Sequence, residues 1–172
     1  MSALAPRAPS ASAVRDQVYM VFPNDLNGND TVFGGLIMAQ MDRIAAVVAD
    51  RHAGGVCVTV GVDAVHFLAP ARKGDVLIFH AAVNRSWTTS LEVGVRVEAE
   101  AIGRDTPRRH ILSAYLTFIA LDGEGRPRPV PALAPENDRE RQRFDEAGLR
   151  RAARLKHAEE LRTLRAGGPP RT

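Results

Sequence analysis

The sequence predicts a single domain of the α+β class, and three observations lead to this prediction. Residues 36–49 are apolar at nearly every position, as in a helix that is surrounded on most sides. Residues 90–101 alternate between apolar and mostly charged side chains, as in a strand with one buried face. One predicted strand precedes the helix and four follow it. A chain of 172 residues, 45% of them apolar, is enough for one buried core.

The predicted elements follow the order of the chain. Residues 14–22 alternate weakly and suit a first strand, and the Asn, Asp and Gly residues of 23–31 form a concentrated turn signal. The helix is expected to begin near Gly34 and to stop at the glycines of residues 52–55. The later strands are predicted at residues 56–67, 75–87, 90–101 and 110–122.

The chain divides into three predicted segments. We expect residues 1–13 to be a flexible tail, residues 14–135 to form the domain, and residues 136–172 to form a charged C-terminal helix and tail. Apolar residues recur in the last segment at mostly helical spacing, interrupted by Gly148. The formal net charge of +3 arises entirely after Pro135, where charges of both signs alternate. Such alternation is typical of a solvated helix face, so no nucleic-acid partner is predicted.

Several classes of function find no support in the sequence. The N-terminal residues lack the pattern of a signal peptide, and charges interrupt the longest apolar run before it reaches the length of a membrane span. The single cysteine, Cys57, permits no intrachain disulfide and suits a reducing cytoplasm. No G-x-S-x-G motif, zinc-like histidine spacing or phosphate-binding G-x-x-x-x-G-K-[ST] loop occurs. His66 is predicted to be a half-buried strand residue and not a catalyst.

Asp42 is unexpected because it interrupts the apolar run. A helix that begins near Gly34 presents free backbone N–H groups at Gly34 and Gly35, which can bind an anion or an oxyanion. Asp42 follows about two turns later, and an unpaired buried carboxylate is costly enough that a functional reason is expected. Alternatively, Asp42 lies on an exposed stripe with Gln40 and Arg43, or pairs with Arg43. The spacing alone leaves both interpretations open.

Five stretches of the sequence carry a resemblance to a known family. They are "NGNDTVFGGLIMAQMD" from Asn27, "TVGVD" from Thr59, "FLAPARKGD" from Phe67, "TTS" from Thr88 and "TFIALDGEGRP" from Thr117. In this order and with these gaps, residues 18–131 resemble the hot-dog acyl-CoA thioesterases, and most closely the cytosolic acyl-CoA hydrolases. The resemblance implies a hot-dog fold, in which a curved antiparallel sheet wraps a long central helix.

The same resemblance implies an activity and a set of catalytic residues. It implies hydrolysis of acyl-CoA to a carboxylic acid and CoA, with CoA as part of the substrate and with no separate cofactor or metal. Asp42 would act as a general base or as a nucleophile, and Asn27 would hold the thioester or the water. The backbone N–H of Gly35 would stabilise the oxyanion. In the family, each site combines residues of two subunits, two sheets join edge to edge, and three such dimers often form a hexamer.

Further residues are expected at the substrate site on the strength of this resemblance. They are Thr31, Phe33, Gly34, Phe67, Thr88, Thr89 and Ser90. Trp87 replaces a glycine that is common in the family, so its ring either stacks on the adenine or covers the core. Asp30 also occupies a position where relatives commonly have glycine. The CoA phosphates need cationic partners, for which the candidates are Arg51, Arg72, Lys73 and Arg85, although each also suits an ordinary surface charge.

Two other functions are compatible with this scaffold. A hot-dog dehydratase would need a histidine paired with an acid, and Phe33 stands where such a histidine would help. A noncatalytic acyl-CoA sensor or scaffold would have no use for a costly acid at Asp42. Asn27 can also be explained as a simple turn former. We expect a homo-oligomeric cytoplasmic hydrolase.

Overall fold

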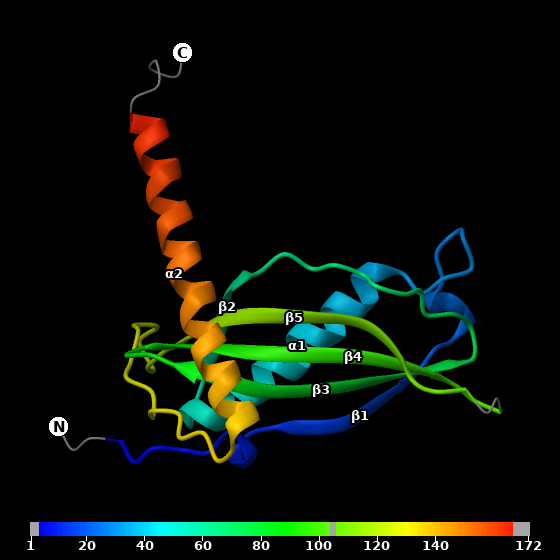
Figure 1. The fold of residues 1–172 in the computed structure, drawn as a ribbon, viewed down its shortest axis with the longest axis horizontal. Coiled ribbons are helices and arrows are strands. Elements are labelled where there is room, and N and C mark those ends of the chain that lie inside the picture. The colour runs from blue at the N-terminus through cyan, green and yellow to red at the C-terminus, as the bar shows by residue number, and fades with distance from the viewer. Residues whose placement is uncertain (1–3, 104–105, 167–172) are drawn as a thin grey trace.

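One five-stranded antiparallel sheet lies between two helices in this computed structural model, which describes residues 4–103 and 106–166 (Figure 1). The elements are β1 (Val14–Met20), α1 (Gly34–Ala53), β2 (Cys57–Val62), β3 (Asp75–Ser86), β4 (Ser90–Ala101), β5 (Arg109–Ala120) and α2 (Asp138–Ala166), with short 3-10 turns η1 (Pro9–Ala11) and η2 (Pro23–Asp25). The strand order is β1-β3-β4-β5-β2, so β1 and β2 are the two edges. The α+β, hot-dog prediction is confirmed.

The core lies between α1 and the sheet face that it covers, here called the inner face. Alternate residues of β4, from Leu91 to Ala99, are buried there, as their alternation predicts. The helix contributes Ile37, Met41 and Ala45 to the same cluster. The opposite side of the sheet, here called the outer face, is crossed by α2 (Figure 1).

The start and stop of α1 agree with the sequence prediction. The helix begins at Gly34 and ends at Ala53, and Gly54 follows in the left-handed conformation with φ 71°. A glycine adopts this conformation without steric cost, which explains why the helix stops here. The guanidinium of Arg7 donates hydrogen bonds to the last carbonyls of α1, at 2.7 Å to Arg51 and 2.8 Å to His52.

The predicted strand at residues 56–67 is too long. β2 ends at Val62, and residues 63–71 leave the sheet as an irregular connection. Their alternating pattern is that of a strand, but the ladder between β5 and this segment ends at Val62, and beyond it single hydrogen bonds from the N–H groups of Asp63 and Leu68 reach β5. His66, predicted to be half-buried, is therefore exposed on this connection.

α2 is also different from the prediction, because Gly148 does not interrupt it. The helix continues from Asp138 to Ala166. A Cβ atom at Gly148 would lie 2.5 Å from Nη1 of Arg85, so the glycine makes room for this side chain and is not a helix stop. Packing on the sheet here outweighs the low helix propensity of glycine.

The N-terminal residues described by the structure lie against the domain. The backbone of Arg7 exchanges hydrogen bonds with residues 132 and 134, at 2.9 Å each. Ser12 is buried. These contacts hold residues 7–12 in place, although the sequence predicts a flexible tail for residues 1–13. Residues 1–3 and 167–172 of the two predicted tails lie outside the described residues.

Candidate active site

The first turn of α1 is enclosed by two aromatic side chains. A Cβ atom at Gly34 would lie 3.2 Å from the ring of Phe67, and one at Gly35 would collide with the ring of Phe33. The absence of side chains at both glycines therefore lets the rings lie against the helix backbone. This arrangement brings four predicted site residues together around the N-terminus of α1, where partial positive charge accumulates.

A groove opens beside this helix terminus. It has a volume of about 360 Å³ and is lined by Asn27, Thr31, Val32, Gly34, Ile37, Phe67, Leu68, Ala69, Pro70, Ala71 and Ile111. Most of these side chains are apolar, whereas Asn27 and Thr31 supply polar groups at one side. An apolar groove with a few convergent polar groups is typical of a small-molecule site.

Asn27 holds its own turn and keeps one donor available. Its Oδ1 accepts a hydrogen bond from the backbone N–H of Asn29 at 2.9 Å, and its Nδ2 donates to Oγ1 of Thr31 at 2.9 Å. The turn-former interpretation is therefore part of its role. Because an amide nitrogen carries two hydrogens, the second can still bind a ligand. Asp30 completes the turn at φ 57°, in the left-handed region that glycine occupies most easily.

Asp42 is half-buried on α1, and Thr59 of β2 binds it. The hydroxyl of Thr59 donates a hydrogen bond of 2.7 Å to Oδ1 of Asp42. Among the described residues, Asp42 forms no ion pair with the neighbouring Arg43. Sequence reasoning assigned no role to Thr59. Two signals were available: its place at the start of the "TVGVD" stretch, and the alternation of β2, which puts it on the same face of the sheet as Cys57.

The two elements that carry this pair also carry exposed apolar residues. Met38 and Val47 lie on α1, and Val58 and Val60 lie on the edge strand β2, with exposed fractions between 39% and 53%. A partner on this surface would remove Asp42 from bulk water. In a single chain, the carboxylate lies at the margin of the molecule and does not line the groove beside Asn27.

Most of the predicted cationic and hydroxyl residues lie near one or the other end of α1. Arg72 forms a bridge with Thr31 and is followed by the exposed Lys73, so both lie near the groove. Arg51 lies in the last turn of α1. The turn that contains Thr88 and Thr89 lies near that same end, because the carbonyl of Thr89 accepts a hydrogen bond from the N–H of Ala120, which pairs with Cys57.

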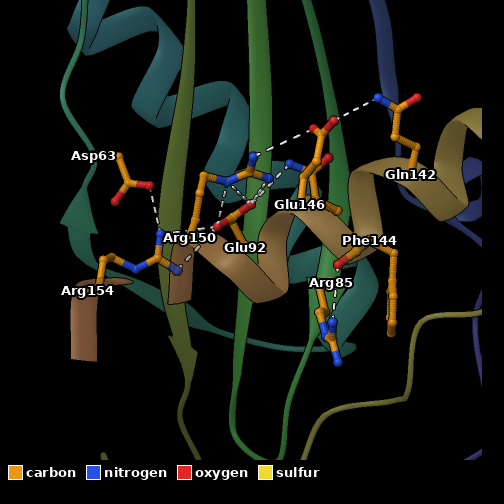
Figure 2. Close-up of polar contacts among 9 residues, drawn as sticks. Asp63, Arg85, Glu92, Gln142, Phe144, Glu146, Arg150 and Arg154 are labelled. Atoms are coloured by element: carbon orange, nitrogen blue, oxygen red, sulfur yellow. Dashed lines mark hydrogen bonds and ion pairs between the residues drawn. The ribbon is translucent and has the colours of Figure 1, made fainter. Parts of the chain in front are cut away.

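Three predicted substrate residues lie instead beneath α2 on the outer face. The guanidinium of Arg85 lies 4.1 Å from the ring centroid of Phe144 and donates to its carbonyl oxygen (Figure 2). Arg151 lies 4.5 Å from the ring centroid of Trp87 and donates to Oγ of Ser90 at 3.1 Å. The structure does not bring these three side chains to Asp42. The ring of Trp87 lies between the guanidinium groups of Arg85 and Arg151, at 5.9 Å and 4.5 Å from its centroid.

A larger hollow on the outer face is separate from this site. It has a volume of about 560 Å³, and its lining includes His80, Arg96, Tyr115 and Arg143. None of the residues predicted to be catalytic lines it. The sheet separates it from Asp42. It is therefore not part of the candidate active site, although it is the larger of these two cavities.

Cys57 is unsuited to nucleophilic catalysis. Burial, reinforced by the charge of Asp50, raises the pKa of its thiol to about 11. The thiolate is the reactive form, and it is scarce at neutral pH.

Within the described residues, no helix combines the length and apolar character that a membrane crossing requires.

Comparison with known proteins gives related enzymes. The family model of the thioesterase superfamily matches residues 29–105. Acyl-coenzyme A thioesterase 11 of Mus musculus is 35% identical over 147 residues, which are 86% of this chain and 25% of that protein. The chain thus spans about a quarter of this relative. YkhA of Bacillus subtilis, named as an uncharacterized acyl-CoA thioester hydrolase, is 39% identical over 120 residues, which are 70% of this chain and 69% of that protein.

Solved structures agree over nearly the whole chain. An apo-hexameric acyl-CoA thioesterase superposes with a TM-score of 0.86 at 34% identity, covering 90% of this chain and 98% of that one. The acyl-CoA hydrolase of Staphylococcus aureus, in complex with butyryl coenzyme A, has a TM-score of 0.81 at 37% identity, covering 92% and 98%. Alanine variants of the same enzyme have also been solved, at an aspartate, a threonine and an asparagine. From its sequence identity and its fold, this chain belongs to the hot-dog acyl-CoA thioesterases of the thioesterase superfamily.

Proposed function

We propose that the protein hydrolyses the thioester of acyl-CoA to a carboxylic acid and CoA, with Asp42 as the catalytic carboxylate. The observation that carries the proposal is the 2.7 Å hydrogen bond from Thr59 to Asp42, at an apolar margin of the molecule. It fixes one carboxylate oxygen and leaves the other to act. The substrates in related enzymes are acyl-CoA thioesters, and CoA is part of that substrate.

The Staphylococcus aureus variants support the choice of residues. Their asparagine and aspartate are separated by 15 positions, and their aspartate and threonine by 17. Asn27, Asp42 and Thr59 have the same separations in this chain. The three residue types and both intervals agree in a chain that is 36% identical. This agreement supports including Thr59 in the proposed site, although the sequence analysis did not single it out.

Two routes of hydrolysis are compatible with the site, and in both of them negative charge develops on the carbonyl oxygen of the thioester. In the general-base route, Asp42 removes a proton from water, the hydroxide adds to the carbonyl carbon, and the C–S bond then breaks. The proton returns to the CoA thiolate. In the nucleophilic route, Asp42 itself attacks the carbonyl carbon and the C–S bond breaks to release CoA thiolate; water then hydrolyses the resulting anhydride, and its proton passes to the thiolate. In both routes, the backbone N–H of Gly35 stabilises the oxyanion. Single-turnover hydrolysis in ¹⁸O water distinguishes them, because only the second can label Asp42.

We further propose that two chains form each site through the β2 edges. α1 has 20 residues, about 30 Å in length, and the predicted site residues gather at both of its ends. A two-fold axis beside β2 would place the Asn27 end of one chain next to the Arg51 and Thr88 end of the other. The exposed valines of β2 suit such a contact. Since three related enzymes are named as hexameric, three such dimers are the expected assembly. Cytosolic relatives support a cytoplasmic location.

CoA release measured over a series of acyl lengths tests the proposal. Asp42→Asn should lower kcat by about 10² to 10⁴, the range for the loss of a general base. Thr59→Ala and Asn27→Ala should lower it by smaller factors. Asp50→Asn on the same helix is the matched control, because its Oδ1 only accepts the Cys57 backbone N–H at 2.8 Å. Full activity of Asp42→Asn would exclude the catalytic role. Binding of acyl-CoA without turnover by the parent chain would indicate a sensor, and hydration of enoyl-CoA would indicate a dehydratase.

A further inference from the structure

A fully buried carboxylate on the outer face ties α2 to the sheet. Glu92 of β4 is 0% exposed and lies beneath two arginines of α2 (Figure 2). Arg150 donates to Oε1 of Glu92 at 2.7 Å, and Arg154 donates to Oε2 at 3.1 Å. Arg150 also lies 3.6 Å from the ring centroid of Tyr115 on β5. A buried charge needs such partners, so the position of α2 on the sheet is closely defined.

Arg154 has a second carboxylate partner at the end of β2. Its Nη1 donates to Oδ2 of Asp63 at 2.7 Å, so one guanidinium bridges Asp63 and Glu92 (Figure 2). The backbone N–H of Asp63 donates to the carbonyl oxygen of Tyr115 at 3.0 Å. The first residue after β2 is therefore fixed both to α2 and to β5.

A bulge makes it possible to hold β2 from both faces. Residues four positions apart in a regular strand point to the same side. In β2 the register shifts between Thr59 and Gly61, so Val60 is an additional residue. As a result, Thr59 points to the inner face and reaches Asp42, whereas Asp63 points to the outer face and reaches Arg154.

Within one chain, the rest of β2 has few side-chain contacts to hold it. The strand has six residues at the edge of the sheet, and five of them are exposed. Its hydrogen bonds to β5 change register at the bulge, next to Thr59. The hydrogen bond between Thr59 and Asp42 thus depends on where the end of the strand is held.

We propose that Asp63 and Arg154 are positioning residues for thioester hydrolysis. Their ion pair on the outer face fixes β2 so that the Thr59 hydroxyl orients the Asp42 carboxylate on the inner face. This inference rests on the proposed function. It assigns to the C-terminal helix a part in the chemistry, although α2 lies on the other side of the sheet from Asp42.

Kinetics of Asp63→Asn and Arg154→Met test the proposal. Each should lower kcat about tenfold or more, because a small displacement of a catalytic group is costly, and should change KM less than about threefold. Arg154→Lys keeps the charge and should recover part of kcat. Arg162→Met is the matched control on the same helix, since Arg162 pairs only with the exposed Glu159, at 2.9 Å. Asp63→Asn is the more conservative variant, because it leaves Glu92 with both arginines.

A double-mutant cycle separates positioning from general stabilisation. If Asp63 acts through Thr59, Asp63→Asn should cause little further loss of kcat in a Thr59→Ala background. Independent, multiplicative losses would overturn the inference, as would an unchanged kcat in Asp63→Asn. In both cases an active parent chain leaves the proposed function intact. A parent chain without hydrolysis would overturn the proposed function itself, and the positioning role with it.

Discussion

At the scale of single residues, two carboxylates differ in their burial and in the partners that hold them. Asp42 is half-exposed and needs only Thr59, whereas Glu92 is fully buried and is held by two arginines. The first arrangement leaves a carboxylate oxygen for chemistry, and the second uses its carboxylate for structure. The burial of an acid therefore does not by itself identify a catalyst.

Cys57 gives a prediction about reactivity. Because burial raises the pKa of its thiol to about 11, roughly one thiol in a thousand is ionised at pH 8. Iodoacetamide should label the folded protein slowly at pH 8 and the urea-unfolded protein rapidly, as measured by mass spectrometry. Rapid labelling of the folded chain would show that the thiol is accessible and ionised.

His52 gives a prediction about pH and stability. Burial lowers the pKa of its imidazole in the folded chain, where its Nε2 lies 3.1 Å from the carbonyl oxygen of Pro131. The unfolded chain takes up a proton as the pH falls below about 6.5, and the folded chain resists it. The contribution of neutral His52 is thus fully present above this pH and is lost below it.

Urea unfolding at pH 7.5 and at pH 5.5 checks this prediction. The free energy of unfolding should be lower at pH 5.5, and the difference should be smaller in His52→Gln. His157→Gln, at a histidine whose side chain is 72% exposed on α2, should leave the difference unchanged. An equal pH dependence in the parent chain and His52→Gln would contradict it.

The residues identified from the sequence and those that were missed differ in how far along the chain their contact partners lie. The glycine pair and Asp42 belong to one continuous stretch, where helix periodicity places them relative to each other. Thr59, Asp63 and Glu92 gain their roles from partners 17 to 91 positions away. No local pattern contains such pairings. The contacts of Arg85 and Trp87 with α2 were not predicted, because the sequence does not place α2 on the sheet.

At the scale of elements, α1 and the central strands follow their periodicity, whereas β2 and α2 depend on their neighbours. The alternation of residues 56–67 does not reveal where β5 stops pairing, so the end of β2 was misplaced. From the sequence, Gly148 predicts an interruption of the helix, because the space that Arg85 needs beside it is not apparent there. The end of an edge strand and the effect of a packed glycine on a helix therefore cannot be predicted without the three-dimensional structure.

α2 gives a prediction that separates its two halves. Its contacts with the sheet come from residues up to Arg154, and beyond them the helix extends away from the domain (Figure 1). The far half holds exposed pairs such as Lys156–Glu160, which contribute only a few tenths of a kcal/mol. A chain ending at Leu155 should therefore lose less than about 4 °C in Tm.

Arg150→Met is the contrasting variant within the contacting half. It removes the closer partner of a fully buried carboxylate, so it should cost about 3 kcal/mol. Calorimetry of both variants provides the comparison. A larger loss for the shortened chain than for Arg150→Met would show that the far half of α2 has contacts that stabilise the assembly.

At the scale of the whole molecule, the two edges of the sheet should behave differently. Val60 on β2 and Val18 on β1 are 53% and 60% exposed, respectively. Val60→Lys places a charge in the proposed contact, so it should lower both the mass in solution and the hydrolysis rate. Val18→Lys is the matched control at the other edge. Light scattering that gives equal masses for both variants would exclude β2 as the contact.

Shared sites also predict complementation between two impaired chains, measured as activity above the residual activity of each variant alone. If Asn27 and Asp42 of one site come from different chains, a mixed dimer of Asn27→Ala and Asp42→Asn has one intact site and one doubly altered site. Random reassociation of equal amounts should recover about one quarter of the parent activity, because half of the dimers are mixed. Assays before and after joint refolding measure this recovery. A site contained in one chain would recover nothing.

The extension of α2 beyond the domain has a practical consequence. Thr163 is exposed on these far turns. Its hydroxyl donates a hydrogen bond to the carbonyl oxygen of Glu159 on the same helix, at 3.1 Å. A spin label or fluorophore attached there, through Thr163→Cys, would avoid the groove and the β2 edge. Since Cys57 is buried, such a label would attach selectively. Distances between labels would then report how many copies assemble and how they are arranged.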